Sequence, residues 1–199
     1  MSRAHIRLAD GRDSVALAEM RYRFRAETGK VNETKSQFVR RCAPWMRKRF
    51  HQKSLSRWRC WIFEDGKQLL GHVCVQLFEK IPNPVEEDEI HAYVTNCYVV
   101  PESRNRKIGQ KLLKKALAWC RAQRVDAVIL WPTRASKTFY RRSGFAPAGD
   151  IFELRDEHST TQRFNHSSRR NALHKKNRSS LESGRARSAS SRSVPGVSP

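Results

Sequence analysis

The strongest pattern of apolar and polar positions lies between Tyr93 and Gln123. Residues 93–100 are mostly apolar and predict a buried strand, and residues 101–109 predict a basic turn. Apolar residues then recur at three- and four-residue steps, which predicts an amphipathic helix running to about Gln123. The apolar face of this helix consists of Ile108, Leu112, Leu113, Ala116, Leu117 and Cys120.

The start of this predicted helix is rich in cations, because Arg104, Arg106 and Lys107 lie in the turn before it. The first N–H groups of a helix lack partners within the helix, and the helix dipole is positive at that end. We therefore expect the turn to hold a phosphate-bearing ligand. The alternative is a solvated basic helix start that binds no ligand.

The N-terminal part of the chain predicts one strand and two helices. Residues 4–9 alternate and indicate a short strand, and the helix that follows should end at Gly29. Thr34 and Gln37 match a capping box that opens the second helix. Pro44 should kink or split this second helix, because proline lacks an N–H donor and clashes with the preceding turn.

The middle of the chain predicts a β-hairpin. Residues 57–64 and 68–79 are two strand-like runs on either side of Asp65-Gly66, a dipeptide that favours a tight turn. Residues 81–89 are acidic and interrupted by prolines, which indicates a loop. In the first run, one face should carry Trp58, Cys60 and Ile62, and the other Arg57, Arg59 and Trp61.

The C-terminal third completes a mixed α/β pattern. Residues 125–131 predict a fully covered inner strand, residues 133–142 a short helix, and residues 145–147 and 151–155 closing strands. The predicted order of elements is β–α–α–β–β–β–α–β–α–β, in a single domain of residues 1–158. Residues 159–199 are rich in serine and arginine and predict a disordered tail.

The chain is strongly basic, with a formal net charge of +21. The predicted tail has nine Lys/Arg against one acid, Glu182, and so accounts for +8, which leaves +13 for residues 1–158. Such charge is compatible with nonspecific nucleic-acid binding, although no helix-turn-helix, zinc-finger or RNA-binding aromatic motif accompanies it.

The cysteines and apolar segments predict a cytoplasmic protein without a metal. Five scattered cysteines without a CxxC pair favour buried free thiols over disulfides or a zinc site. No apolar run approaches the roughly 18–20 residues of a membrane span, and the N-terminus has no signal-peptide core. These patterns do not indicate an oligomeric state.

Two segments identify a family resemblance. TNCYVVPESRNRKIGQKLL at residues 95–113 and ILWPTRASKTFYRRSGFAPA at residues 129–148 resemble the GNAT superfamily of N-acetyltransferases, and the order of elements over residues 4–156 is similar. The resemblance implies a mixed, mostly antiparallel sheet flanked by helices. It also implies acetyl-CoA as co-substrate and transfer of its acetyl group to a primary amine.

The resemblance implies that acetyl-CoA binds at the strand and turn of the first segment. Main-chain donors of the turn would hold the pyrophosphate, and the strand before it would pair with the pantetheine arm. Thr133 would contact the pantetheine or simply cap a helix, and the strand valines would also serve as core. The implied coenzyme residues are Tyr98, Val99, Val100, Arg104, Asn105, Arg106, Lys107, Ile108, Gly109, Gln110 and Thr133.

The turn departs from the family pattern (Q/R)-x-x-G-x-(G/A) at one position. Lys107 stands where the first glycine is expected, whereas Arg104 and Gly109 match. A glycine lets the backbone approach a phosphate closely, and a lysine Cβ crowds that approach. Lysine retains its N–H and can adopt right-handed helical geometry, so we expect weakened rather than abolished coenzyme binding.

The implied reaction is direct attack of an amine on the thioester. Tyr140 matches the family tyrosine that protonates the departing thiolate; the alternative is a purely packing role. Glu27, Glu89 and His91 are candidate bases, or else ordinary surface residues. We expect Cys97 to be a core thiol. The acceptor is a small-molecule amine or a peptide amino group. Two other functions stay open: nonspecific nucleic-acid binding, with a weak contact through the tail, and acyl-CoA binding without turnover.

Overall fold

The computed structural model describes residues 4–29, 31–50 and 57–149. The chain divides into two compact units, Met1–Gly149 and Asp150–Pro199, of which the first is described below. The predicted strand at residues 151–155, the domain boundary at residue 158 and the predicted tail lie outside the described residues. The main elements are β1 (His5–Leu8), α1 (Ser14–Glu27), α2 (Lys35–Phe50), β2 (Trp58–Asp65), β3 (Gln68–Glu79), β4 (Ile90–Val99), α3 (Ile108–Ala122), β5 (Ala127–Ile129) and α4 (Lys137–Arg142).

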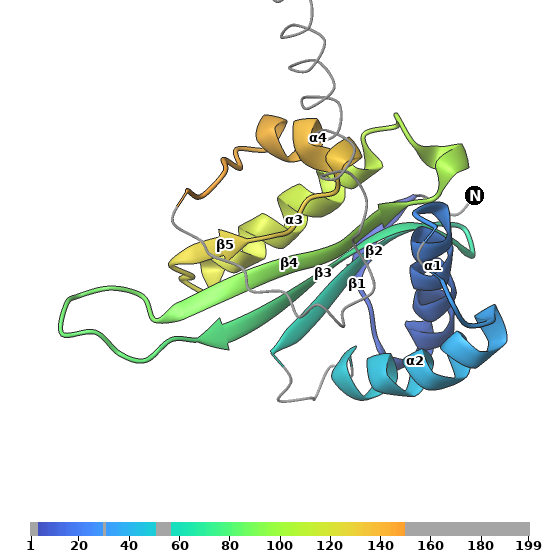
Figure 1. Cartoon of the computed structure of the whole chain (residues 1–199), viewed down its shortest axis with the longest axis horizontal. Coiled ribbons are helices and arrows are strands. Elements are labelled where there is room, and N and C mark those ends of the chain that lie inside the picture. Colours follow the sequence, from blue (N-terminus) through green and yellow to red (C-terminus); the bar gives the residue numbers. More distant parts are fainter. Residues whose placement is uncertain (1–3, 30, 51–56, 150–199) are drawn as a thin grey trace, which may run out of the picture. The chain divides into compact units, whose positions relative to one another are not determined.

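The strands form one mixed sheet in the order β1-β2-β3-β4-β5 (Figure 1). The first four strands pair antiparallel, and β5 runs parallel to β4. The predicted hairpin is confirmed: Asp65 pairs with Gln68, and Gly66 takes the positive φ of 62° that the tight turn requires. The predicted fold class, a mostly antiparallel sheet flanked by helices, is therefore confirmed.

The sheet is covered on both faces, α1 and α2 lying on one side and α3 on the other (Figure 1). In β2, Cys60 and Ile62 pack in a core cluster with residues of α1 and α2, whereas Trp61 and Phe63 pack in a second cluster with residues of α3. The predicted alternation is confirmed, because Trp58 packs with Cys60 and Ile62, whereas Trp61, on the face of Arg59, belongs to the second cluster and is 3% exposed. The apolar face predicted for α3 is confirmed, and its residues belong to the second cluster.

Local signals at the N-terminal helices mostly agree with the structure. The capping box is present: the Thr34 N–H donates to Gln37 Oε1 at 2.9 Å, and the Gln37 N–H donates to Thr34 Oγ1 at 3.3 Å. Gly29, with φ of 65°, follows the end of α1 as predicted. Pro44 does not split the second helix, because α2 continues through it; losing one donor is tolerated in a helix packed on the sheet.

The C-terminal strands differ from the prediction. Only Ala127–Ile129 pair with β4, and Trp131, expected in a fully covered strand, is 54% exposed. Phe145 to Pro147 form no strand; the Phe145 ring instead packs against Tyr140 at 5.7 Å between centroids. The apolar run at residues 125–131 is therefore longer than the part that pairs with β4 in the sheet.

The described residues contain no helix that is long and apolar enough to cross a membrane. They also hold no group of three or more His, Cys, Asp or Glu side chains arranged as metal ligands. All five cysteines are free, as expected, and Cys60, Cys74 and Cys120 are buried.

Candidate active site

One edge of β4 is without a strand partner over half of its length. Its parallel pairing with β5 ends at Tyr93 and Ile129, and past this point no strand of the described chain pairs with that edge. An extended ligand can hydrogen-bond to a strand edge as an additional strand does. The end of this pairing thus leaves backbone groups of β4 available from residue 94 onward.

A β-bulge interrupts β4 on this open stretch. The pairing with β3 shifts from Thr95 opposite Cys74 to Tyr98 opposite His72, so β4 has one additional residue, and Asn96 takes a positive φ of 52°. The bulge places adjacent side chains against different helices. Asn96 contacts Arg21 of α1, and Cys97 lies next to Tyr140 of α4, both packed against the same core cluster.

The turn after β4 is tied to α1 by the side chain of Arg104. Its Nε donates to the carbonyl of Val99 at 3.1 Å, and its Nη2 lies 2.5 Å from Glu27 Oε2. The other oxygen of Glu27 accepts a hydrogen bond from the Tyr98 hydroxyl at 2.5 Å. Burial alone would raise the pKa of Glu27, but the hydrogen bonds from Tyr98 and Arg104 outweigh burial and lower it. Glu27, a candidate base, is therefore a weak base engaged in an ion pair.

Lys107 adopts a left-handed conformation, with φ of 60° and ψ of 12°. The prediction of right-handed geometry at this residue is wrong. Asn105 also has a positive φ, 64°, because the chain must reverse between the 3-10 turn at Pro101–Ser103 and the first residue of α3. Lys107 thus keeps the backbone conformation that glycine adopts without strain, while its own side chain is exposed to solvent.

The start of α3 is available to a ligand. Lys107 precedes the helix without a side-chain cap, and the first helical hydrogen bond to it comes from the Lys111 N–H at 3.0 Å. Ile108 is buried, and Gly109 and Gln110 follow it in the first turn of α3. A Cβ on Gly109 would meet only ordinary contacts with Val99 and Phe139, at 3.6 and 3.7 Å. Arg106 is exposed beside this turn.

Tyr140 lies on the other side of the β4 bulge from α1. Its ring packs between Phe139 and Phe145, with centroid distances of 5.0 and 5.7 Å. Burial, together with the neighbouring Cys97, raises the pKa of the phenol well above its usual value near 10. Burial likewise raises the pKa of Cys97, which keeps it a neutral thiol. The pair therefore supplies a protonated phenol at the strand, and no thiolate nucleophile.

Thr133 occupies the position before a short 3-10 helix, Arg134–Ser136, that leads into α4. Its side chain makes no capping hydrogen bond to the backbone; Oγ1 donates to Ser136 Oγ at 3.0 Å instead. Thr133 is exposed. Of the two roles considered for it, side-chain capping of the helix is not observed.

A comparison with protein families identifies the family of this chain. Residues 28–145 match the model of the Acetyltransferase (GNAT) family. The chain belongs to the GNAT family. Among solved structures, the chain resembles a GCN5-related N-acetyltransferase from Ralstonia eutropha JMP134, with a TM-score of 0.64, 22% identity and coverage of 77% of this chain and 99% of the other.

Two further structures share the GNAT fold. A predicted acetyltransferase with acetyl-CoA from Clostridium acetobutylicum aligns with a TM-score of 0.61 and 19% identity, covering 77% and 96% of the two chains. Glucosamine-6-phosphate N-acetyltransferase from Arabidopsis thaliana aligns with a TM-score of 0.54 and 15% identity, covering 78% and 99%. No curated protein matches this chain by sequence. At these identities the structures establish the fold alone.

Two of the candidate bases of this GNAT domain lie far from the bulge. His91 is at the start of β4 and its Nε2 lies 3.0 Å from Asp126, which also pairs with Lys80. Six residues separate His91 from Cys97, a path of about 20 Å along a strand. Glu89 precedes β4 and is more distant still. The structure does not bring either residue to the predicted coenzyme site.

Arg21 lies beside the β4 bulge, and the sequence patterns above did not single it out. Its Nη1 donates to Asn96 Oδ1 at 3.1 Å, and its guanidinium lies over the Phe24 ring, 5.6 Å from the centroid. The helical spacing of the sequence could have indicated that Arg21 faces the core. Arg21 follows Leu17 by four residues and precedes Phe24 by three, so it belongs to the buried face of α1.

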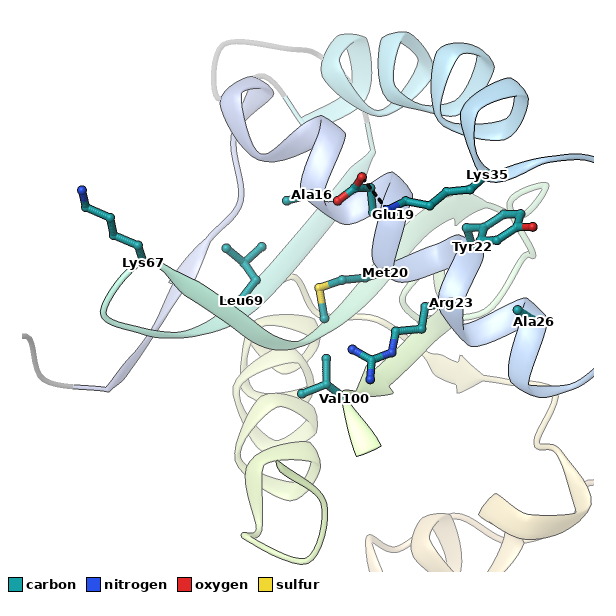
Figure 2. Close-up of a pocket in the computed structure, with 10 residues that line it drawn as sticks. All are labelled: Ala16, Glu19, Met20, Tyr22, Arg23, Ala26, Lys35, Lys67, Leu69 and Val100. Atoms are coloured by element: carbon teal, nitrogen blue, oxygen red, sulfur yellow. Dashed lines mark ion pairs between the residues drawn. The ribbon is translucent and has the colours of Figure 1, made fainter. Parts of the chain in front are cut away.

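A separate cavity lies on another side of α1 (Figure 2). Its volume is about 480 Å³, and an ion pair of 2.9 Å between Lys35 and Glu19 lies at its edge. Val100 is its only residue from the predicted coenzyme set. The lining residues are Ala16, Glu19, Met20, Tyr22, Arg23, Ala26, Lys35, Lys67, Leu69 and Val100. It includes neither Tyr140 nor Cys97, so we do not assign it to the reaction.

Proposed function

We propose that this protein transfers the acetyl group of acetyl-CoA to a primary amine by direct attack. The observation that carries the proposal is the contact between Tyr140 and Cys97 at the bulge of β4, beside a strand edge that is open from residue 94 onward. Transfer from a thioester requires an acid for the departing thiolate and donors for the developing oxyanion. The protonated phenol of Tyr140 and the unpaired N–H groups of β4 would supply both at one place.

Coenzyme binding would use mainly the backbone. The pyrophosphate would lie at the start of α3, where Ile108, Gly109 and Gln110 present the first N–H groups of the helix. Arg106 and Lys107 are exposed there and would add positive charge. Arg104 would act indirectly, since its guanidinium holds the turn against Val99 and Glu27.

The pantetheine arm would pair with the open edge of β4, around Tyr98 and Val99. The Val100 N–H is not available, because it donates to the Leu70 carbonyl at 3.0 Å. Val100 would therefore contribute packing rather than a hydrogen bond. The exposed Thr133 hydroxyl lies before α4 and would offer a polar contact on the α4 side.

In the chemical step, the neutral amine attacks the thioester carbonyl carbon and forms a C–N bond. A backbone N–H of β4 would stabilise the oxygen that becomes negative. The C–S bond then breaks, and Tyr140 gives its proton to the departing thiolate, whose pKa of about 8.5 lies below that of the phenol. The ammonium proton of the attacking amine leaves to water, and the phenol recovers a proton from solvent.

The test is a screen of amines with acetyl-CoA, following thiol release and the acetylated product together. We expect turnover with at least one amine class. Tyr140→Phe should lower kcat by roughly 10²–10⁴-fold, with little change in the Kd for acetyl-CoA. Tyr22→Phe is the matched control, because the Tyr22 hydroxyl only donates to the Glu33 carbonyl, at 3.3 Å. Equal turnover by wild type and Tyr140→Phe would remove the assigned role.

An acyl-CoA-binding protein without turnover predicts a different result. Acetyl-CoA would raise the melting temperature through binding to the folded state, but no amine would be acetylated. Absence of both a thermal shift and turnover at millimolar acetyl-CoA would contradict both functions.

A further inference from the structure

Arg21 differs from Arg7, another half-buried arginine of the described chain. The Arg7 guanidinium donates to both oxygens of Asp13 at 2.8 Å and to Glu64 at 2.7 Å. Its charge is therefore fully compensated by two carboxylates. Within residues 4–29, 31–50 and 57–149, Arg21 makes no ion pair with any acid, and its one hydrogen-bond acceptor is Asn96 Oδ1.

The described residues around Arg21 supply no counter-charge and one hydrogen-bond acceptor. A guanidinium carries five N–H donors, and a single amide oxygen accepts one of them. The Phe24 ring offers only a cation–π contact, and Arg25 on the same helix adds like charge. Burial is the main reason that the pKa of Arg21 is lowered. A partly buried cation without a counter-charge is costly, so it indicates an anion that binds there.

Arg21 lies where an acceptor would bind. Asn96, which it contacts, is adjacent to Cys97, and Cys97 lies next to the predicted acid Tyr140. The α4 side of the bulge is therefore the side of the departing thiolate. An attacking amine would approach from the opposite side, which is the side of α1. Its substituents would then lie next to the guanidinium.

We propose that the acceptor is a small amine that carries a carboxylate, as an amino acid does, and that Arg21 binds this carboxylate. This inference rests on the proposed acetyl transfer. A planar guanidinium matches a planar carboxylate through two parallel hydrogen bonds, which makes carboxylate the better fit than a tetrahedral phosphate. The proposal also favours a free small molecule over a peptide amino terminus, which has an amide where the amino acid has its carboxylate.

The test compares amino acids with their carboxamides, which keep the shape and lose the charge. In acetyl transfer by wild type, kcat/KM for the acid should exceed that for the amide by about 10–100-fold, as expected for a charge-assisted pair. Arg21→Met should bring this ratio close to one, and Arg21→Lys should give an intermediate ratio. Arg23→Met is the control for charge, because Arg23 lies on α1 but pairs with the exposed Glu102; its ratio should match wild type.

Stability separates a binding role from a structural role. If Arg21 serves a ligand, Arg21→Met removes an uncompensated charge while keeping an apolar stem over Phe24, so the melting temperature should stay the same or rise. If Arg21 were only structural, the variant would melt lower and lose activity on acids and amides alike, which would overturn the proposal. Equal use of acids and amides by wild type would also overturn it. If phosphoethanolamine is preferred over every amino acid, the carboxylate proposal is wrong, and the anion that Arg21 binds is a phosphate.

A binding measurement keeps the inference distinct from the proposed reaction. If no amine is acetylated, acetyl transfer fails, and the same amino acids are then tested by thermal shift at millimolar concentration. A rise that amides do not produce, and that Arg21→Met abolishes, would support the carboxylate site alone. Absence of any such rise would overturn it.

Discussion

Replacing Lys107 by glycine should stabilise the domain. A left-handed conformation costs a residue with a Cβ about 1–2 kcal/mol, and Lys107 has φ of 60° and ψ of 12°. Glycine avoids this cost but adds freedom to the unfolded chain, which is worth about 0.5–1 kcal/mol in the opposite direction. The difference predicts a net gain of roughly 0.5–1 kcal/mol in the free energy of unfolding.

Urea unfolding followed by tryptophan fluorescence measures this gain, and the melting temperature should rise by about 1–4 °C. Lys107→Ala is the informative control, because it removes the ammonium and keeps the Cβ, so it should show no comparable gain. Lys111→Gly removes an exposed lysine from the right-handed interior of α3 and should lose about 1 kcal/mol.

The comparison of Lys107→Gly with Lys107→Ala also reports on the coenzyme. Both variants lack the cation, so a tighter Kd for acetyl-CoA in the glycine variant isolates the effect of the Cβ on phosphate approach. If the two variants are equally stable, or if Lys107→Gly behaves like Lys111→Gly, the left-handed conformation and the strain argument are wrong.

Three further predictions concern pH and the tail. Because the pKa of Tyr140 is raised, the phenol stays protonated, and kcat should show no descending limb below about pH 10; a fall centred near pH 8 would contradict its role as the acid. The buried ring of His72 has no hydrogen-bond partner of normal geometry in the described chain, and burial lowers its pKa to about 4, with nearby Asn96 opposing the shift. As pH falls, His72 is therefore protonated in the unfolded chain before it is protonated in the folded chain. Up to about 3 kcal/mol of the free energy of unfolding present above pH 6.5 should be lost by pH 4. His72→Leu should flatten this dependence of the urea midpoint, and an unchanged slope would refute the assignment. Removing residues 159–199 should weaken duplex DNA binding and reduce its salt dependence; equal binding by the shortened chain would show that the tail makes no such contact.

The elements that sequence patterns predicted well are those defined by neighbouring residues. The Asp65-Gly66 hairpin, the capping box of Thr34 and Gln37, and the apolar face of α3 all follow from spacing within about ten residues. Each depends on turn geometry or helical periodicity, which the local chain dictates. The strand, turn and helix between Ile90 and Ala122 belong to this class, and the structure confirms the strand and the helix, whereas the coenzyme site there stays a prediction.

The features that the sequence did not predict arise from contacts between distant segments. The alternation in β2 assigned its side chains to two faces, but it did not show that α3 covers the face of Trp61. Lys107 is left-handed because the chain must turn from β4 into α3. A lysine in the sequence does not indicate such a conformation. The role proposed for Arg21 depends on its contact with Asn96, 75 residues later, and on the absence of an ion pair with any acid of the described chain.

One helix connects the two halves of the proposed reaction. On α1, Glu27 pairs with Arg104 of the predicted coenzyme turn. Arg21, which would face the proposed acceptor, lies six residues or about 9 Å earlier on the same helix. A coenzyme that shifts this turn would also shift Arg104, and with it the C-terminal end of α1. The affinities for the two substrates would then be interdependent, and linkage requires that acetyl-CoA changes the acceptor Kd by the same factor by which the acceptor changes the acetyl-CoA Kd.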